Sequence, residues 1–364
     1  MLLQTLVSTL LLSLVLPVTA TPAGLVARQN KCPSETVVLE RTTQEFVDAA
    51  SKGTPIYKMS FKDARQFLEN VQAKENPSLS TVDYSEYNLP IGPTGNVNLH
   101  IYRPKGSAGK SLPVTFYFHG GGWILGSPNT HRRLIFDLMK ETNSAILFVH
   151  YTCSPEAQFP IPVQQAWSAV EWLQKNGKKM NLDTSRVAFA GDSAGGAMAA
   201  AVNLMSIEKN AMHLIPKYQV LFYPVTDISK ESCSYKTFAK GPGLVPETLR
   251  WMIGEYTHDS KARTNILASP LLASKEMLAK MPKTMIITAQ ADPLRQEGED
   301  FAHKLKESGV QVTMTRAMGT IHDFVVLNPL AKTPATRTAI EAAGRALKKA
   351  LKKEMPRVSC RAAM

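Results

Sequence analysis

Charged side chains are missing from the first 27 residues, and the first charge is Arg28. Residues 10–16 form an apolar run broken only by Ser13, and small residues follow at positions 18–20, where a signal peptidase would cut. We therefore expect residues 1–20 to be a signal peptide and the mature chain to be secreted. An uncleaved signal anchor is the alternative, because the uncharged stretch is long enough to span a bilayer. No second apolar stretch of that length follows, so no stable membrane span is expected once the leader is removed.

Cysteine is scarce, with only four residues: Cys32, Cys153, Cys233 and Cys360. Their wide separation excludes a local CxxC zinc or redox motif. An even number in a secreted chain permits two disulfides in three connectivities, between which the sequence does not choose. Free buried thiols are the alternative. Neither a metal ion nor an organic cofactor is expected.

Nucleic-acid motifs are also missing, although the net charge is +12. No zinc-finger spacing or RNP-like aromatic motif accompanies the basic residues. Much of the excess lies within or after a helical pattern at 340–351, where lysine and arginine favour the helix dipole and the solvent. We expect a solvated helix face and no nucleic-acid partner. The oligomeric state cannot be predicted.

What is present is an ordinary globular composition, 44% hydrophobic and 20% charged, in which apolar strands alternate with helices. This alternation predicts an α/β fold with a mostly parallel central sheet and helices on both faces. The predicted strands are 97–102, 113–118, 145–149, 186–190, 218–223, 284–288 and 310–315. The main predicted helices are 162–176, 194–208, 295–308 and 335–353. Residues 36–80 and 232–265 do not fit the alternation and are expected to leave the sheet and cover its edge.

The sequence GDSAGG at 191–196 lies between a predicted strand and a predicted helix. This G-x-S-x-G pattern in that context predicts a nucleophile elbow, a sharp turn that holds the hydroxyl of Ser193 clear of the sheet. A glycine-rich turn with a capping serine is the structural alternative. The sequence HGGGW at 119–123 follows another strand, and its consecutive glycines leave backbone N–H groups free to bind an oxyanion.

A serine nucleophile needs a histidine base and an orienting carboxylate, and this fold class places them in the chain order serine, acid, histidine. Asp292 and His322 satisfy that order, and each follows a predicted strand. Among the competing acids, Glu297, Glu299 and Asp300 are expected to be helical and more solvated. Asp323 adjoins His322 and is expected to face away from it.

Taken together, these motifs resemble the hormone-sensitive-lipase-like family of α/β-hydrolase carboxylesterases. The matching segments are HGGGW, GDSAGG, DPLR at 292–295, His322-Asp323-Phe324 and, in part, YTCSPEAQFP at 151–160. The resemblance covers about residues 60–350. It implies a triad of Ser193, Asp292 and His322, and an oxyanion hole made by the N–H groups of Gly121, Gly122 and Ala194. It departs from the family pattern at Thr152-Cys153-Ser154, where an arginine usually helps to hold the loop.

The resemblance also implies the domain organisation and the activity. We expect a leader at 1–20, a linker at 21–35, N-terminal cap helices at 36–80, a hydrolase core at 81–231 and 266–355, and a cap insertion at 232–265. The expected reaction is hydrolysis of short- to medium-chain acyl esters, or of an acylated small metabolite, through an acyl-enzyme. An amide or N-acyl deacylase with the same triad is one alternative, and a non-catalytic receptor for small ligands is another.

Overall fold

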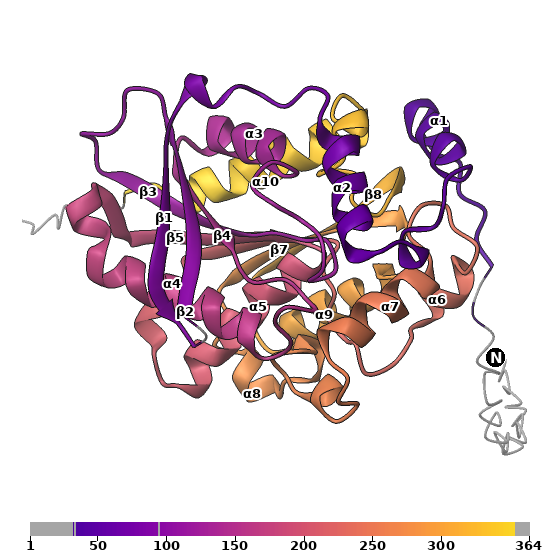
Figure 1. The fold of residues 1–364 in the computed structure, drawn as a ribbon. Helices are drawn as coiled ribbons and strands as arrows, with labels where there is room; N and C mark the ends of the chain where they lie inside the picture. Colours follow the sequence, from indigo (N-terminus) through magenta and orange to yellow (C-terminus); the bar gives the residue numbers. More distant parts are fainter. Residues whose placement is uncertain (1–31, 33, 94, 354–364) are drawn as a thin grey trace, which may run out of the picture. The chain divides into compact units, whose positions relative to one another are not determined.

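The computed structural model describes residues 32, 34–93 and 95–353, so the predicted leader and Cys360 lie outside the described residues. The described chain forms an eight-stranded sheet with helices on both faces (Figure 1). The strand order is β1-β2-β4-β3-β5-β6-β7-β8. Only the β1–β2 and β2–β4 pairs are antiparallel. The predicted α/β class with a mostly parallel sheet is confirmed.

The strands are β1 (Val82–Gly92), β2 (Gly95–Pro104), β3 (Leu112–Phe118), β4 (Ala145–His150), β5 (Leu182–Asp192), β6 (Tyr218–Phe222), β7 (Lys283–Ala291) and β8 (Val312–Ile321). The α-helices are α1 (Arg41–Ala50), α2 (Phe61–Gln72), α3 (Arg132–Thr142), α4 (Ile161–Asn176), α5 (Ala194–Glu208), α6 (Cys233–Thr237), α7 (Pro246–Tyr256), α8 (Lys275–Leu278), α9 (Arg295–Glu307) and α10 (Pro334–Ala350).

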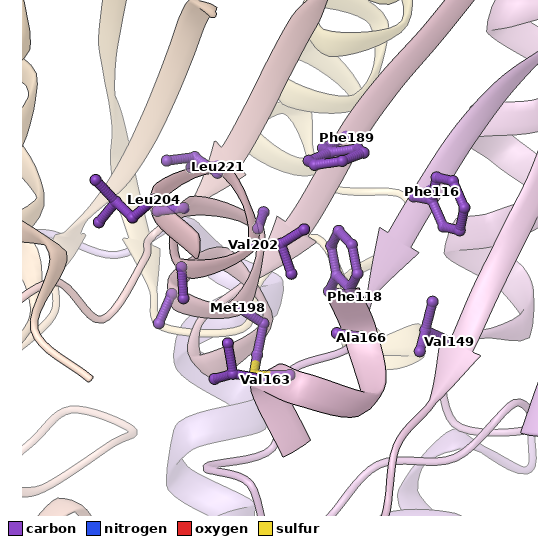
Figure 2. Packing of buried hydrophobic residues seen from close by; sticks show 14 of the residues in the cluster. Phe116, Phe118, Val149, Val163, Ala166, Phe189, Met198, Val202, Leu204 and Leu221 are labelled. Carbon is purple, nitrogen blue, oxygen red and sulfur yellow. The ribbon is translucent and has the colours of Figure 1, made fainter. Parts of the chain in front are cut away.

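The central strands are apolar on both sides because helices cover both faces of the sheet. Helices α4, α5, α8 and α9 pack on one face, and α3 and α10 pack on the other. Figure 2 shows the first face, where Phe116, Phe118 and Phe189 of the sheet meet Met198 and Val202 of α5. Full burial of side chains of this size stabilises the fold by roughly 1.5–3 kcal/mol each. The resulting core holds the carboxyl ends of β5, β7 and β8 in fixed positions.

The amino-acid compositions of α5 and α10 reflect how deeply each helix is buried. Helix α5 is rich in alanine and glycine and is buried from Ala194 to Ile207, since small side chains let it lie close to the sheet and to α4. Helix α10 is amphipathic, and Ile340 and Leu347 are among its buried residues. The hydroxyl of Thr333 caps α10 by accepting a hydrogen bond from the N–H of Thr336.

The structure corrects two expectations about the elements. Helix α3 was not predicted, although it buries Leu134, Ile135 and Leu138 at helical spacing. The last strand was predicted at 310–315, but β8 continues to Ile321 and so ends directly before His322. Helix α3 covers one face of the sheet, and β8 is an edge strand.

The two stretches that do not fit the alternation contain short helices. Residues 36–80 hold α1 and α2, and Ser60 caps α2 by accepting from the N–H of Asp63 at 3.1 Å. Residues 232–265 hold α6 and α7. A disulfide joins Cys32, ahead of α1, to Cys233 in α6. In the described part of the chain, no helix has the length and apolar character needed to cross a membrane.

Candidate active site

Ser193 lies in a tight turn between β5 and α5. Its φ of 51° and ψ of −120° are unusual for a residue with a side chain, and such strain is typical of functional turns. The flanking glycines are required because neighbouring backbone passes close to them. A Cβ on Gly191 would lie 2.3 Å from the carbonyl oxygen of Gly195, and a Cβ on Gly195 would lie 2.0 Å from that of Phe118. The G-x-S-x-G spacing is therefore a steric requirement of this turn.

The structure brings Ser193, His322 and Asp292 together from three separate strand ends. His322 directly follows β8, and Asp292 directly follows β7. The Oγ atom of Ser193 is 2.9 Å from Nε2 of His322, and Nδ1 of His322 is 2.7 Å from Oδ2 of Asp292. Asp292 is fixed in turn because its Oδ1 accepts a hydrogen bond of 2.8 Å from the N–H of Leu294. If Nδ1–H donates to Asp292, Nε2 is free to accept the proton of the serine hydroxyl.

The charges around His322 determine the pKa of its imidazole. Burial alone would lower the pKa of His322, but the negative charges of Asp292 and then Asp323 raise it to about 9. The two carboxylates therefore stabilise the charged imidazolium relative to the neutral imidazole. A carboxylate cluster of this kind stabilises the charge that a general base acquires when it takes a proton.

Two expectations about the acids were wrong. Asp323 does not face away, because its Oδ1 lies 3.4 Å from Nε2 of His322. Glu297 is helical as expected, but only 2% of its surface is exposed. One of its oxygens accepts hydrogen bonds from the N–H groups of Thr226 at 2.8 Å and Asp227 at 3.3 Å, and burial raises its pKa. Glu297 therefore holds the segment after β6 and does not contact the imidazole.

The loop with the sequence HGGGW at 119–123, called here the glycine loop, is attached to the nucleophile elbow. The attachment is made by Asp192, the residue before Ser193. Asp192 is buried and accepts hydrogen bonds from the N–H of Gly120 at 3.0 Å and from the hydroxyl of Tyr117 at 2.7 Å. A Cβ on Gly120 would lie 2.1 Å from Oδ2 of Asp192, so only glycine fits there. Sequence reasoning missed this function of Asp192, although the residue stands inside the motif.

The predicted oxyanion donors lie at the end of this loop and at the start of α5. Gly121 and Gly122 have φ values of 99° and 60°, which turn the backbone in a way that favours glycine. Both line the same cavity as Ser193 and His322. Ala194 is the first residue of α5, so its N–H has no acceptor within the helix. His119 has a structural position, buried and stacked on Tyr151 at 4.2 Å.

The cavity above Ser193 is apolar and has a volume of about 210 Å³. Residues 36–80 and residues 232–265 both supply its walls. Residues 36–80 contribute Phe46, Ala50, Ile56 and Leu68, and residues 232–265 contribute Gly243, Leu244, Thr248, Leu249, Met252 and Ile253. A second hollow of about 500 Å³ continues from it between α1 and residues 239–248, sharing Phe46 and Gly243 with the first. The site is thus an apolar pocket lined by both of these stretches, with a second hollow next to it.

The segment after β4 lacks the expected arginine and is held by Arg65 of α2 instead. The Arg65 guanidinium donates to both carboxylate oxygens of Glu156, at 2.7 and 2.6 Å. It also donates to the carbonyl oxygens of Ile124 and Ser154, both at 2.9 Å. One side chain of α2 therefore fixes both the glycine loop and the segment at 151–160.

Of the residues at 32, 34–93 and 95–353, no three histidine, cysteine, aspartate or glutamate side chains are grouped so that they could hold a metal ion. Cys153 forms no disulfide with any described residue. Burial raises the pKa of its thiol to about 12, so it is not a reactive thiolate.

Comparison with known proteins agrees with this geometry. Residues 115–326 match the model of an alpha/beta hydrolase fold family. An esterase of Gibberella moniliformis is 36% identical over 283 residues, covering 78% of this chain and 88% of that protein. A thermostable esterase from Pseudomonas putida superposes with a TM-score of 0.83 at 41% identity, covering 88% of this chain and all of that one. Carboxyl esterase 2 from Tuber melanosporum gives a TM-score of 0.79 at 38% identity, covering 86% of this chain and all of that one.

The matched region contains Ser193, Asp292 and His322, and the esterase relatives span nearly the whole described chain. The chain belongs to the hormone-sensitive-lipase-like family of α/β-hydrolase carboxylesterases and is a carboxylesterase-type serine hydrolase that acts on small-molecule esters.

Proposed function

We propose that this esterase hydrolyses short- to medium-chain acyl esters by a two-step acyl transfer at Ser193. His322 accepts the proton of Ser193 as Oγ attacks the ester carbonyl, and then gives it to the leaving alcohol. Water deacylates the enzyme with His322 again acting as the base. The observation that carries this proposal is the hydrogen-bonded series Ser193–His322–Asp292 beneath an apolar cavity.

The N–H groups of Gly121, Gly122 and Ala194 are proposed to bind the oxyanion of the tetrahedral intermediate. Removing one such donor typically costs on the order of 3 kcal/mol of transition-state stabilisation. The apolar cavity of about 210 Å³ at Ser193 is below the usual size of a pocket for a drug-sized ligand, which favours a small acyl group.

Substitution of the nucleophile tests the mechanism. We expect Ser193→Ala to lower kcat for p-nitrophenyl esters by on the order of 10⁴-fold or more, because no other group can form the acyl-enzyme. Ser185→Ala, which changes an exposed serine on β5, is the matched control and should keep full activity. A fluorophosphonate should label the wild type and the control but not Ser193→Ala. Undiminished turnover by a correctly folded Ser193→Ala would disprove the assignment.

A series of p-nitrophenyl esters with increasing acyl length tests the proposed substrate range. We expect kcat/KM to rise from acetate to a short- or medium-chain optimum and then to fall, since longer acyl chains exceed the cavity of about 210 Å³ at Ser193. An optimum at long-chain esters would contradict the proposal.

We also propose that the chain is exported through its N-terminal leader. The disulfide between Cys32 and Cys233 supports export, because disulfides persist in oxidising compartments. In a eukaryotic secretory host we expect the protein in the medium, with an N-terminus near Thr21. Recovery from membranes with residues 1–20 intact would favour the signal anchor, and recovery from the cytosol would contradict export.

A further inference from the structure

The carboxylate of Asp323 faces the nitrogen of His322 that carries the reaction. Its Oδ1 lies 3.4 Å from Nε2, the same nitrogen that contacts Oγ of Ser193 at 2.9 Å. Asp292 contacts the other nitrogen, Nδ1, at 2.7 Å. The imidazole therefore has a carboxylate near each of its two nitrogens, and only one of them belongs to the triad.

The conformation of Asp323 is constrained. Its φ is 64°, in the left-handed region that aspartate and asparagine adopt more easily than most residues with side chains. The carbonyl oxygen of Asp323 accepts hydrogen bonds of 2.9 Å from the N–H groups of both Val326 and Leu327, which fixes the turn. The side chain lines the substrate cavity and keeps 36% of its surface exposed.

The Oδ1 atom of Asp323 is buried and accepts no hydrogen bond from any described residue. A buried acceptor without a partner is unfavourable, and such atoms are few in folded proteins. Nε2 of His322, 3.4 Å away, is a nitrogen that could supply a proton to it. When Nδ1–H donates to Asp292, Nε2 carries a proton only in the charged imidazolium, which forms when His322 takes the serine proton.

We propose that Asp323 is a positioning residue for the general-base step, its carboxylate stabilising the His322 imidazolium while the serine proton resides on Nε2. The inference rests on the proposed function and extends it. The proton passes from Oγ of Ser193 to Nε2 and then to the oxygen of the leaving alcohol. Asp323 neither gains nor loses a proton in this transfer. Its negative charge also makes the free enzyme harder to deprotonate, and so moves the acid limit of activity to higher pH.

Other charged and titratable groups face His322 and Asp323 from the elements that pack against them. Asp192 lies at the end of β5, His131 precedes α3, Asp292 follows β7, and the phenol of Tyr223 follows β6, 4.7 Å from the imidazole. Burial raises the pKa of Asp323, and the charge of His322 lowers it. Removing the charge of Asp323 leaves Asp292 and Asp192 in place, so the pKa of His322 should fall without returning to that of an unpaired buried imidazole.

The variant Asp323→Asn tests the inference, because asparagine keeps the shape and tolerates the positive φ. We expect the pKa of His322, followed by NMR of the ¹⁵N-labelled imidazole, to fall by about one unit. The acid limb of kcat/KM for p-nitrophenyl butanoate should move to lower pH by the same amount. The plateau of kcat at high pH should fall several-fold while KM stays unchanged, since the imidazolium is less stabilised in the transition state.

Three further variants separate charge from backbone effects. Asp323→Gly removes the charge and relieves the positive φ, so its pH profile should match that of Asp323→Asn. Asp323→Glu restores a carboxylate and should return the acid limb toward that of the wild type. Asp300→Asn removes an exposed carboxylate of α9 and should leave the profile unchanged.

An unchanged His322 titration in both Asp323→Asn and Asp323→Gly would overturn the inference. The NMR titration needs no turnover, so this result is independent of the outcome for Ser193→Ala. Loss of turnover in Ser193→Ala together with an unchanged titration in the Asp323 variants would leave the triad intact and remove only the assignment of Asp323.

Discussion

At the scale of single residues, Arg65 shows how a distant side chain can replace a missing local one. The segment Thr152-Cys153-Ser154 has no arginine, and the guanidinium that fixes it comes from α2, 89 residues before Ser154. Arg65 donates to two carbonyl oxygens and to Glu156 at the same time. These contacts use several N–H groups of the planar guanidinium, an arrangement that a lysine cannot reproduce.

We expect Arg65→Met to lower the free energy of unfolding by about 2 kcal/mol, since charge-assisted hydrogen bonds to two carbonyls are lost and the partly exposed ion pair contributes little. Urea denaturation measures this difference. Arg65→Lys should fall between the wild type and Arg65→Met. Lys62→Met, on the exposed face of the same helix, is the control and should unfold as the wild type does. Equal midpoints for Arg65→Met and Lys62→Met would show that the contacts do not stabilise the fold.

The residues of the predicted triad could be read from the sequence because each stands directly after a strand, and the carboxyl ends of parallel strands meet at one edge of the sheet. The side-chain direction of Asp323 and the burial of Glu297 could not be predicted from their positions relative to the strands. The direction of Asp323 depends on a single left-handed φ, and the burial of Glu297 depends on the segment at Thr226, 71 residues earlier. Local sequence patterns contain neither kind of information.

At the scale of elements, the buried strands were predicted well and the peripheral ones less well. Strands β3 and β5 are buried on both sides at their centres, which leaves a continuous apolar run in the sequence. Strand β8 lies at the edge of the sheet, and most of its residues from Val312 to Met318 are exposed, so no continuous apolar run marks how far it extends. Helix α3 did carry an apolar pattern, and Asn143 ends it with a left-handed φ of 53°.

The pairing of Cys32 with Cys233 also belongs to this scale. The two cysteines are 201 residues apart in the sequence, and only the folded core places them together. Cys32 lies in the range expected to be a linker, and Glu35 of the same range pairs with Arg295 at 2.7 Å. The chain ahead of α1 is thus attached both to α6 and to α9.

At the scale of the whole molecule, a group of histidines is enclosed around Phe148. His119 stacks on Phe148 at 5.2 Å, and His100 and His150 lie at 6.1 and 6.5 Å from it. Burial lowers the pKa of all three, and the charge of neighbouring histidines lowers it further for His119 and His150. For His150 the pKa falls to about 4.

These shifts make the stability of the fold depend on pH with a definite sign. An unfolded chain binds a proton at each histidine below about pH 6.5, whereas the folded chain binds one at His150 only below about pH 4. The unfolded state then holds more protons, so stability falls as the pH falls from about 6.5 to about 4. The contribution of His150 alone is about 2 kcal/mol, once its partial exposure is allowed for.

We therefore expect His150→Asn to lose less stability than the wild type between pH 7 and pH 4.5, by about 1–2 kcal/mol. Urea denaturation at the two pH values measures the difference within each protein, so a packing loss that is the same at both pH values cancels. His213→Asn, which changes an exposed histidine, is the matched control and should keep the pH dependence of the wild type. If His150→Asn keeps that dependence as well, His150 is not a source of the acid sensitivity of the fold.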